Sequence, residues 1–165
     1  MKPLDLARVN SLAPYQIVFE DGEFRFETDH DIRYAISFDT EIIEDEIRTY
    51  WFNLSNRSGK ASPGDKKIRM TIVLLLEEFF RTNPDVLLYI CDSANDQQAM
   101  RARLFLRWFN AYGRNEEYYT RTETVKDESE DNYIAIIVRR SHPQFDMVIS
   151  LFEEEISMFR ANKPQ

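Results

Sequence analysis

Residues 86–112 read VLLYICDSANDQQAMRARLFLRWFNAY, and the predicted fold is built outward from them. The stretch opens with an unbroken apolar run from Val86 to Cys91, which Pro84 precedes and Asp92 follows. A short apolar run closed by breakers at both ends predicts a strand that is buried on both faces. Polar residues then offer N-caps, and apolar residues recur at helical spacing up to Tyr112. We therefore predict a central strand that leads directly into a helix, and ligands often bind at such junctions in sheet proteins.

The chain before this strand predicts an antiparallel meander followed by a helix. Asp21-Gly22 is the turn signal of a first hairpin, and the acidic patch from Glu41 to Glu46 is expected as a loop or short turn. Residues 55–65 contain two glycines and a proline and predict a longer loop. The apolar pattern after it predicts a largely buried helix that stops at Asn83-Pro84. Alternation of apolar and polar residues predicts the strands at 15–20, 24–27, 34–39 and 49–54.

The chain after residue 112 predicts two strands, 118–125 and 132–140, joined by an acidic tip, and a last helix from Pro143. The predicted order is four strands, helix, strand, helix, two strands, helix. The strand-helix-strand unit inserts a parallel pair into an otherwise antiparallel sheet. We therefore predict an α+β fold, with a mixed, mostly antiparallel sheet of about seven strands covered by three helices. All 165 residues are expected to form a single domain, in which residues 1–14 are a leader that frays.

Composition limits the classes of function. The formal net charge is −8 at pH 7, whereas nucleic-acid and anionic-membrane binding need clustered positive charge, so neither is expected. Cys91 is the single cysteine and the two histidines lie far apart in the sequence, so no metal site is predicted. The first residues show no apolar signal segment, and no stretch is long and apolar enough to span a bilayer. A cytoplasmic protein is the expectation.

Candidate binding residues lie on the strand end and on the helix that follows it. Arg103, Arg107 and Arg114 share one helical face, and guanidinium groups in a row can hold phosphate or carboxylate groups. Asp92 and Arg101 can orient a polar ligand. A solvated helix face, and helix capping with an ion pair, explain the same residues without a ligand. The candidate ligand-binding set is Asp92, Arg101, Arg103 and Arg107, for a small anionic ligand or a protein partner.

Catalytic signatures are missing from the sequence, which has no serine-histidine-aspartate elbow, no Walker loop and no dinucleotide fingerprint. No catalytic residue is predicted, and an enzyme is not favoured. The predicted function is a non-catalytic module that binds a ligand or a protein, including another copy of the same chain. The aromatic run Tyr50-Trp51-Phe52 can line a pocket or a partner surface, although packing under a helix explains it equally.

Residues 68–108 resemble an uncharacterised bacterial family that is defined only as a domain of unknown function. The likeness lies in four features: Thr71-Ile72 in the helix, Tyr89-Ile90-Cys91-Asp92 at the strand end, Arg101 with Arg103, and the segment from Phe105 to Phe109. This resemblance implies no activity.

The order of elements from Tyr15 to Arg140 also resembles the GNAT superfamily of N-acetyltransferases. Those proteins run from antiparallel strands through a glycine loop into a helix, and a strand, a helix and a final strand pair follow. The loop Asn56-Arg57-Ser58-Gly59-Lys60-Ala61 is similar to their pyrophosphate loop. The resemblance implies acetyl-coenzyme A as a cofactor, held by Arg57, Gly59, Lys60 and Ala61.

The resemblance to acetyltransferases has one departure that affects catalysis. Members of the superfamily often have a tyrosine general acid shortly before a glycine, whereas this chain has Phe109 before Gly113. A phenylalanine cannot donate a proton. The alternative function is therefore a GNAT-like acyltransferase with atypical catalytic residues.

Overall fold

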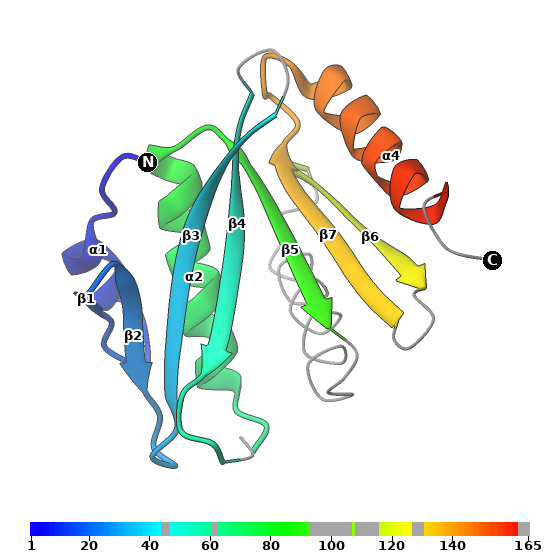
Figure 1. Cartoon of the computed structure of the whole chain (residues 1–165). Coiled ribbons are helices and arrows are strands. Elements are labelled where there is room, and N and C mark those ends of the chain that lie inside the picture. Colours follow the sequence, from blue (N-terminus) through cyan, green and yellow to red (C-terminus); the bar gives the residue numbers. More distant parts are fainter. Residues whose placement is uncertain (44–46, 61–62, 93–106, 108–115, 127–130, 162–165) are drawn as a thin grey trace. The chain divides into compact units, whose positions relative to one another are not determined.

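The computed structural model describes residues 1–43, 47–60, 63–92, 107, 116–126 and 131–161 (Figure 1). Within this part of the chain, helices and strands follow the predicted order, and the α+β class is confirmed. The strands form one seven-stranded mixed sheet in the order β1-β2-β3-β4-β5-β7-β6. In chain order the elements are α1 (Leu6–Asn10), β1 (Val18–Glu20), β2 (Glu23–Glu27), β3 (Arg33–Ile43), β4 (Ile47–Asn56), α2 (Lys66–Thr82), β5 (Val86–Asp92), β6 (Tyr118–Lys126), β7 (Asp131–Arg139) and α4 (Phe145–Ala161).

The described chain divides into two compact units. Unit 1 comprises residues 1–39 and 52–84, and unit 2 comprises residues 40–51 and 85–165. No helix in the described ranges is long and apolar enough to cross a membrane. Apart from Arg107, the helix expected after the Val86 strand lies outside the described residues, including Arg101, Arg103 and Arg114. Ala61 and residues 127–130 of the acidic tip are also outside them.

In unit 1, helix α2 covers one face of the strands. Asp65 is its N-cap, and the Asp65 side chain accepts a hydrogen bond from the backbone N–H of Lys67 at 2.8 Å. The ring of Phe79 stacks on that of Phe38 in β3, with 4.9 Å between the centroids. Because apolar residues occupy most of its girth, α2 is largely buried, as predicted. Its buried residues are Thr71, Ile72, Val73, Leu75, Leu76, Glu78, Phe79 and Phe80.

Residues 1–14, expected as a leader, are hydrogen-bonded to α2 and its C-cap. The backbone N–H of Lys2 donates to the side-chain oxygen of Asn83 at 2.7 Å, and that of Asp5 donates to the Glu78 carboxylate at 3.1 Å. Glu78 is only 4% exposed. The short helix α1 within this segment was not predicted, because five residues are too few to show an apolar period.

The predicted hairpin at Asp21-Gly22 is confirmed, whereas the predicted loop at the acidic patch from Glu41 is wrong in its first three residues. Asp21 and Gly22 both have positive φ, 52° and 77°, as two-residue hairpin turns require. The acidic patch was expected as a loop or turn from Glu41 onward, but β3 continues through Glu41 to Ile43. The paired isoleucines at 42 and 43 favour extended backbone, because β-branched side chains fit a pleated strand.

In unit 2, β5 lies beside β4 in parallel and beside β7 in antiparallel orientation. Residues Thr49 to Trp51 of β4 pair with Val86 to Leu88 of β5. Val86, Leu87 and Leu88 are all buried, which confirms the prediction of a central strand covered on both faces. Helix α4 lies alongside β6 and β7 (Figure 1). The core beneath it contains Ile47, Val86, Leu88, Ile134, Ile136, Val138, Val148, Phe152 and Ile156.

Candidate functional site

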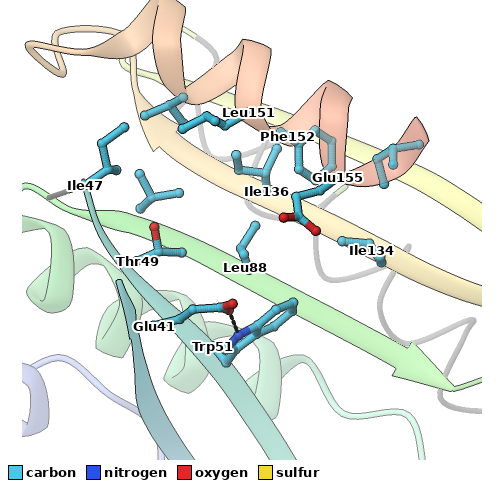
Figure 2. Close-up of a pocket in the computed structure, with 13 residues that line it drawn as sticks. Glu41, Ile47, Thr49, Trp51, Leu88, Ile134, Ile136, Leu151, Phe152 and Glu155 are labelled. Atoms are coloured by element: carbon cyan, nitrogen blue, oxygen red, sulfur yellow. Dashed lines mark hydrogen bonds between the residues drawn. The ribbon is translucent and has the colours of Figure 1, made fainter. Parts of the chain in front are cut away.

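Unit 2 contains a cavity of about 120 Å³ between helix α4 and strands β3, β4, β5 and β7 (Figure 2). Aliphatic and aromatic side chains form most of its wall, and two glutamates, Glu41 and Glu155, also line it. The lining residues are Glu41, Ile47, Thr49, Trp51, Val86, Leu88, Ile134, Ile136, Val148, Leu151, Phe152, Glu155 and Ile156.

Thr49 places a hydroxyl group in the buried wall of the cavity. Its side chain is 0% exposed, and Oγ1 has no hydrogen-bond partner within the described part of the chain. Figure 2 shows this oxygen pointing from β4 toward α4. A buried hydroxyl without a partner costs about 1–3 kcal/mol, and most buried polar groups in native proteins have one. Thr49 is therefore a polar group that a bound molecule can satisfy.

Glu41 and Trp51 form a hydrogen-bonded pair at the cavity. The indole Nε1–H of Trp51 donates to Oε2 of Glu41 (Figure 2). Glu41 lies on β3 and Trp51 on β4, and both side chains are half-buried. The hydrogen bond holds the Glu41 carboxylate beside the cavity, and the Trp51 side chain also packs against the hydrophobic core of unit 2.

Glu155 brings a second carboxylate to the cavity from α4. Figure 2 shows its side chain pointing from the helix toward the sheet, and the residue is exposed to solvent. No lysine, arginine or histidine is among the described residues that line the cavity. Glu41 and Glu155 form no ion pair with the cations of the described ranges. Among the described residues, the negative charge on the polar side of the cavity is therefore not compensated by a cation.

Ion pairs hold α4 against strand β6. Arg121 of β6 pairs with Glu153 of α4 at 2.9 Å and with Glu123 of its own strand at 2.7 Å. Arg160 of α4 reaches back to Glu123 at 3.1 Å. The hydrogen bond from Arg121, aided by that from Arg160, lowers the pKa of the Glu123 carboxyl. These pairs anchor the helix that contributes Leu151, Phe152 and Glu155 to the cavity wall.

The predicted ligand-binding residues are not those that line this cavity. Asp92 is the last residue of β5, where its backbone pairs with Asn132 of β7, and its side chain is outside the description. Arg107 is helical and exposed. Arg101 and Arg103 lie outside the described residues, so the grouping of these four residues stays a prediction.

Arg57, predicted to hold a cofactor, is engaged with protein groups. Its guanidinium pairs with Glu23 and donates to the Ser55 hydroxyl at 2.8 Å. Its backbone N–H donates to the carbonyl of Arg33 at 2.7 Å. The pKa of Glu23 is lowered, first by its hydrogen bond from Arg25 and then by that from Arg57.

The rest of the predicted cofactor loop is folded on itself. The backbone N–H of Ser58 donates to the side-chain oxygen of Asn56 at 2.9 Å, and the Asn56 amide donates to the carbonyl of Lys60 at 2.8 Å. Gly59 has a φ of +68°, a conformation that favours glycine. Ala61 is outside the described residues. The backbone N–H groups of Arg57 and Ser58 therefore already donate hydrogen bonds to groups of the chain itself.

The sequence alone did not single out Thr49, Glu41 or Glu155. Trp51 was noted only as part of an aromatic run. The sequence held one signal for Glu41: the two isoleucines that follow it favour a strand, which would place its carboxylate on the sheet and not in a loop. None of the described residues forms a group of histidines, cysteines and carboxylates that could hold a metal ion.

A family model described as a family of unknown function (DUF6169) matches residues 64–154, more than half of the chain. The chain belongs to this family. The predicted resemblance to a domain of unknown function is thereby confirmed. The DUF6169 match covers the apolar walls that β5, β7 and most of α4 contribute, while Glu41, Thr49, Trp51 and Glu155 lie outside it. No curated protein and no solved structure matches the chain significantly.

Proposed function

We propose that this chain is a non-catalytic module that binds a small molecule in the cavity beneath α4. The observation that carries the proposal is a cavity of about 120 Å³ whose apolar wall contains the hydroxyl of Thr49, which has no hydrogen-bond partner among the described residues. An unfilled apolar cavity and an unpaired buried hydroxyl both destabilise a folded chain. A ligand that fills the space and bonds the hydroxyl removes both penalties at once.

The size of the cavity limits the group that enters it. An engineered apolar cavity of roughly 150 Å³ binds benzene, so this one accommodates a ring or a branched chain of about five or six carbon atoms. Neither histidine, cysteine nor lysine occurs among the described residues of its lining, so the usual nucleophile-base pairs are not assembled there. Binding without chemistry is the function that this lining supports best.

The test uses 4-fluorobenzyl alcohol as a neutral probe, followed by ¹⁹F NMR of the probe. A ligand of this size is expected to bind with a Kd of about 1 mM. Leu151→Trp places a larger ring in the cavity and should abolish binding. Ile149→Trp is the matched control, because Ile149 is also a half-buried residue of α4 but does not line the cavity. Absence of binding by the unmodified chain at roughly 10 mM probe would overturn the proposal.

The alternative, a GNAT-like acyltransferase that uses acetyl-coenzyme A, is favoured by the strand order. Helix α2 connects β4 to the parallel strand β5, and β6 and β7 follow, as the resemblance implies. Isothermal calorimetry against coenzyme A and acetyl-coenzyme A tests it, with Arg57→Ala and Gly59→Asp as loop variants. Micromolar binding that both variants lose would place the acyltransferase ahead. Absence of a binding signal at ligand concentrations up to about 1 mM would rule out the acyltransferase alternative.

A further inference from the structure

We infer that the ligand of this cavity is a small primary amine whose ammonium group binds at Glu41 and Glu155 and whose apolar body fills the space beneath α4. The inference rests on the proposed function and names the chemical class of its ligand. Two independent features of the cavity support it: the charge of its polar side and the orientation of the indole ring.

The charge of the polar side selects a cation. Glu41 and Glu155 approach the cavity from opposite elements, β3 and α4, and neither has a cationic partner among the described residues. A carboxylate near an apolar, low-dielectric wall attracts a cation more strongly than one in bulk water does. An anionic ligand would meet two like charges without a counter-ion. An ammonium group supplies the missing positive charge and three hydrogen-bond donors for the carboxylate oxygens.

Trp51 adds a second element of cation recognition. Its Nε1–H is already bonded to Glu41, so the indole is held in one orientation and has no donor left for a ligand. The remaining means of recognition is the electron-rich face of an aromatic ring, which attracts ammonium groups within about 6 Å of the ring centre. A carboxylate and an aromatic face held together in this way suit an amine better than a neutral alcohol.

Thr49 defines how the rest of the ligand is received. Its hydroxyl can donate or accept a hydrogen bond within the mostly apolar wall beneath α4, and it has no partner among the described residues. A polar atom on the body of the amine, such as a hydroxyl oxygen, would satisfy it. The ligand class is therefore an amine with a compact apolar body, and a second polar atom on that body would improve its affinity.

The experiment measures Kd by ¹⁹F NMR for three probes of the same shape, 4-fluorobenzylamine, 4-fluorobenzyl alcohol and 4-fluorobenzoate. The amine should bind at least about tenfold more tightly than the alcohol, and the benzoate should bind least. Glu41→Gln keeps an oxygen that can accept from Trp51 but removes the charge, and it should reduce the preference for the amine to about threefold or less. Glu155→Gln should lower the preference less, to about fivefold, because that carboxylate is exposed.

The matched control is Glu154→Gln, since Glu154 neighbours Glu155 on α4 but does not line the cavity. It should leave all three Kd values unchanged, which separates a local contact from a general effect of net charge. Equal binding of amine and alcohol, or tightest binding of the benzoate, would overturn the inference and leave the cavity as a binding site. Failure of every probe to bind would instead overturn the proposed function.

Discussion

Replacing Thr49 by valine is expected to stabilise the free protein. The substitution keeps the shape of the side chain and exchanges the hydroxyl for a methyl group. Thr49 is 0% exposed and its Oγ1 has no partner in the described part of the chain. Removal of an unsatisfied buried hydroxyl relieves a penalty of about 1–3 kcal/mol, and a buried methyl contributes about 0.8 kcal/mol more. After an allowance for water that can enter a cavity of this size, we expect an increase of about 1–2 kcal/mol in the free energy of unfolding.

Thr71 offers a matched control for this prediction. It is also 0% exposed, but its hydroxyl donates to the carbonyl of Lys67 at 2.7 Å and accepts from the backbone N–H of Tyr15 at 3.3 Å. Thr71→Val leaves these buried groups unsatisfied and should lower the free energy of unfolding by about 1–3 kcal/mol. The same chemical change is thus expected to have opposite signs at two equally buried positions.

The assay is urea unfolding, followed by tryptophan fluorescence and by far-ultraviolet circular dichroism. With a slope of about 2 kcal/mol per molar urea, Thr49→Val should raise the midpoint by about 0.5–1 M. Coincident transitions by the two probes justify reading the midpoints as free energies. If Thr49→Val lowers the urea midpoint as Thr71→Val does, the Thr49 hydroxyl has a hydrogen-bond partner in the folded chain. The proposed ligand site would then have no unpaired hydroxyl in its wall.

Three further predictions concern ion pairs and titration. Arg121→Ala should accelerate hydrogen exchange of the α4 amides while lowering global stability by about 1 kcal/mol or less, because these pairs are partly exposed. The pKa of Glu78 is lowered below 4.5, chiefly by its hydrogen bond from Arg81. Its contribution to stability is therefore present above pH 4.5 and is lost as the pH falls through the lower folded value, so a urea midpoint measured from pH 7 to pH 3 should fall less in Glu78→Gln. Burial, and then the hydrogen bond to Asp65, raise the pKa of Tyr15 to about 12. Its contribution is complete below pH 10 and is lost as the pH rises to 12. Burial also raises the pKa of Tyr50, so absorbance at about 295 nm should show late-titrating phenols, and Tyr15→Phe should remove one of them.

The fold was predictable where its signals are local. Asp21-Gly22 fixes the first hairpin, the apolar run at Val86 marks the central strand, and the apolar periodicity before Asn83 marks α2. Two features were missed because the local signal was absent or misleading. Helix α1 is too short to show a period, and the charges around Glu41 indicated a loop although the strand continues to Ile43.

The candidate site was not predictable, because it arises from packing between distant segments. Thr49, Glu41 and Glu155 come from two strands and the last helix, and nothing in their spacing indicates that they share a cavity. In a strand, threonine and valine fit the pleat equally well, so the sequence cannot show that the hydroxyl of Thr49 lacks a partner. In the predicted binding set, Arg101 and Arg103 lie outside the described residues, so the grouping of that set stays a prediction.

The position of the family match has a consequence for ligand specificity. The apolar lining residues of β5 and β7, and those of α4 up to Phe152, lie within residues 64–154. The lining residues outside this range are Glu41, Ile47, Thr49, Trp51, Glu155 and Ile156. The matched region therefore contributes most of the apolar wall, whereas the polar groups of the proposed ligand site lie outside it. An apolar wall accepts any apolar group of the right size, so in the proposed site Glu41, Trp51 and Glu155 are the groups expected to discriminate between amine, alcohol and acid. Membership of the family cannot supply the ligand class, and the amine preference has to be measured on this chain's own carboxylates.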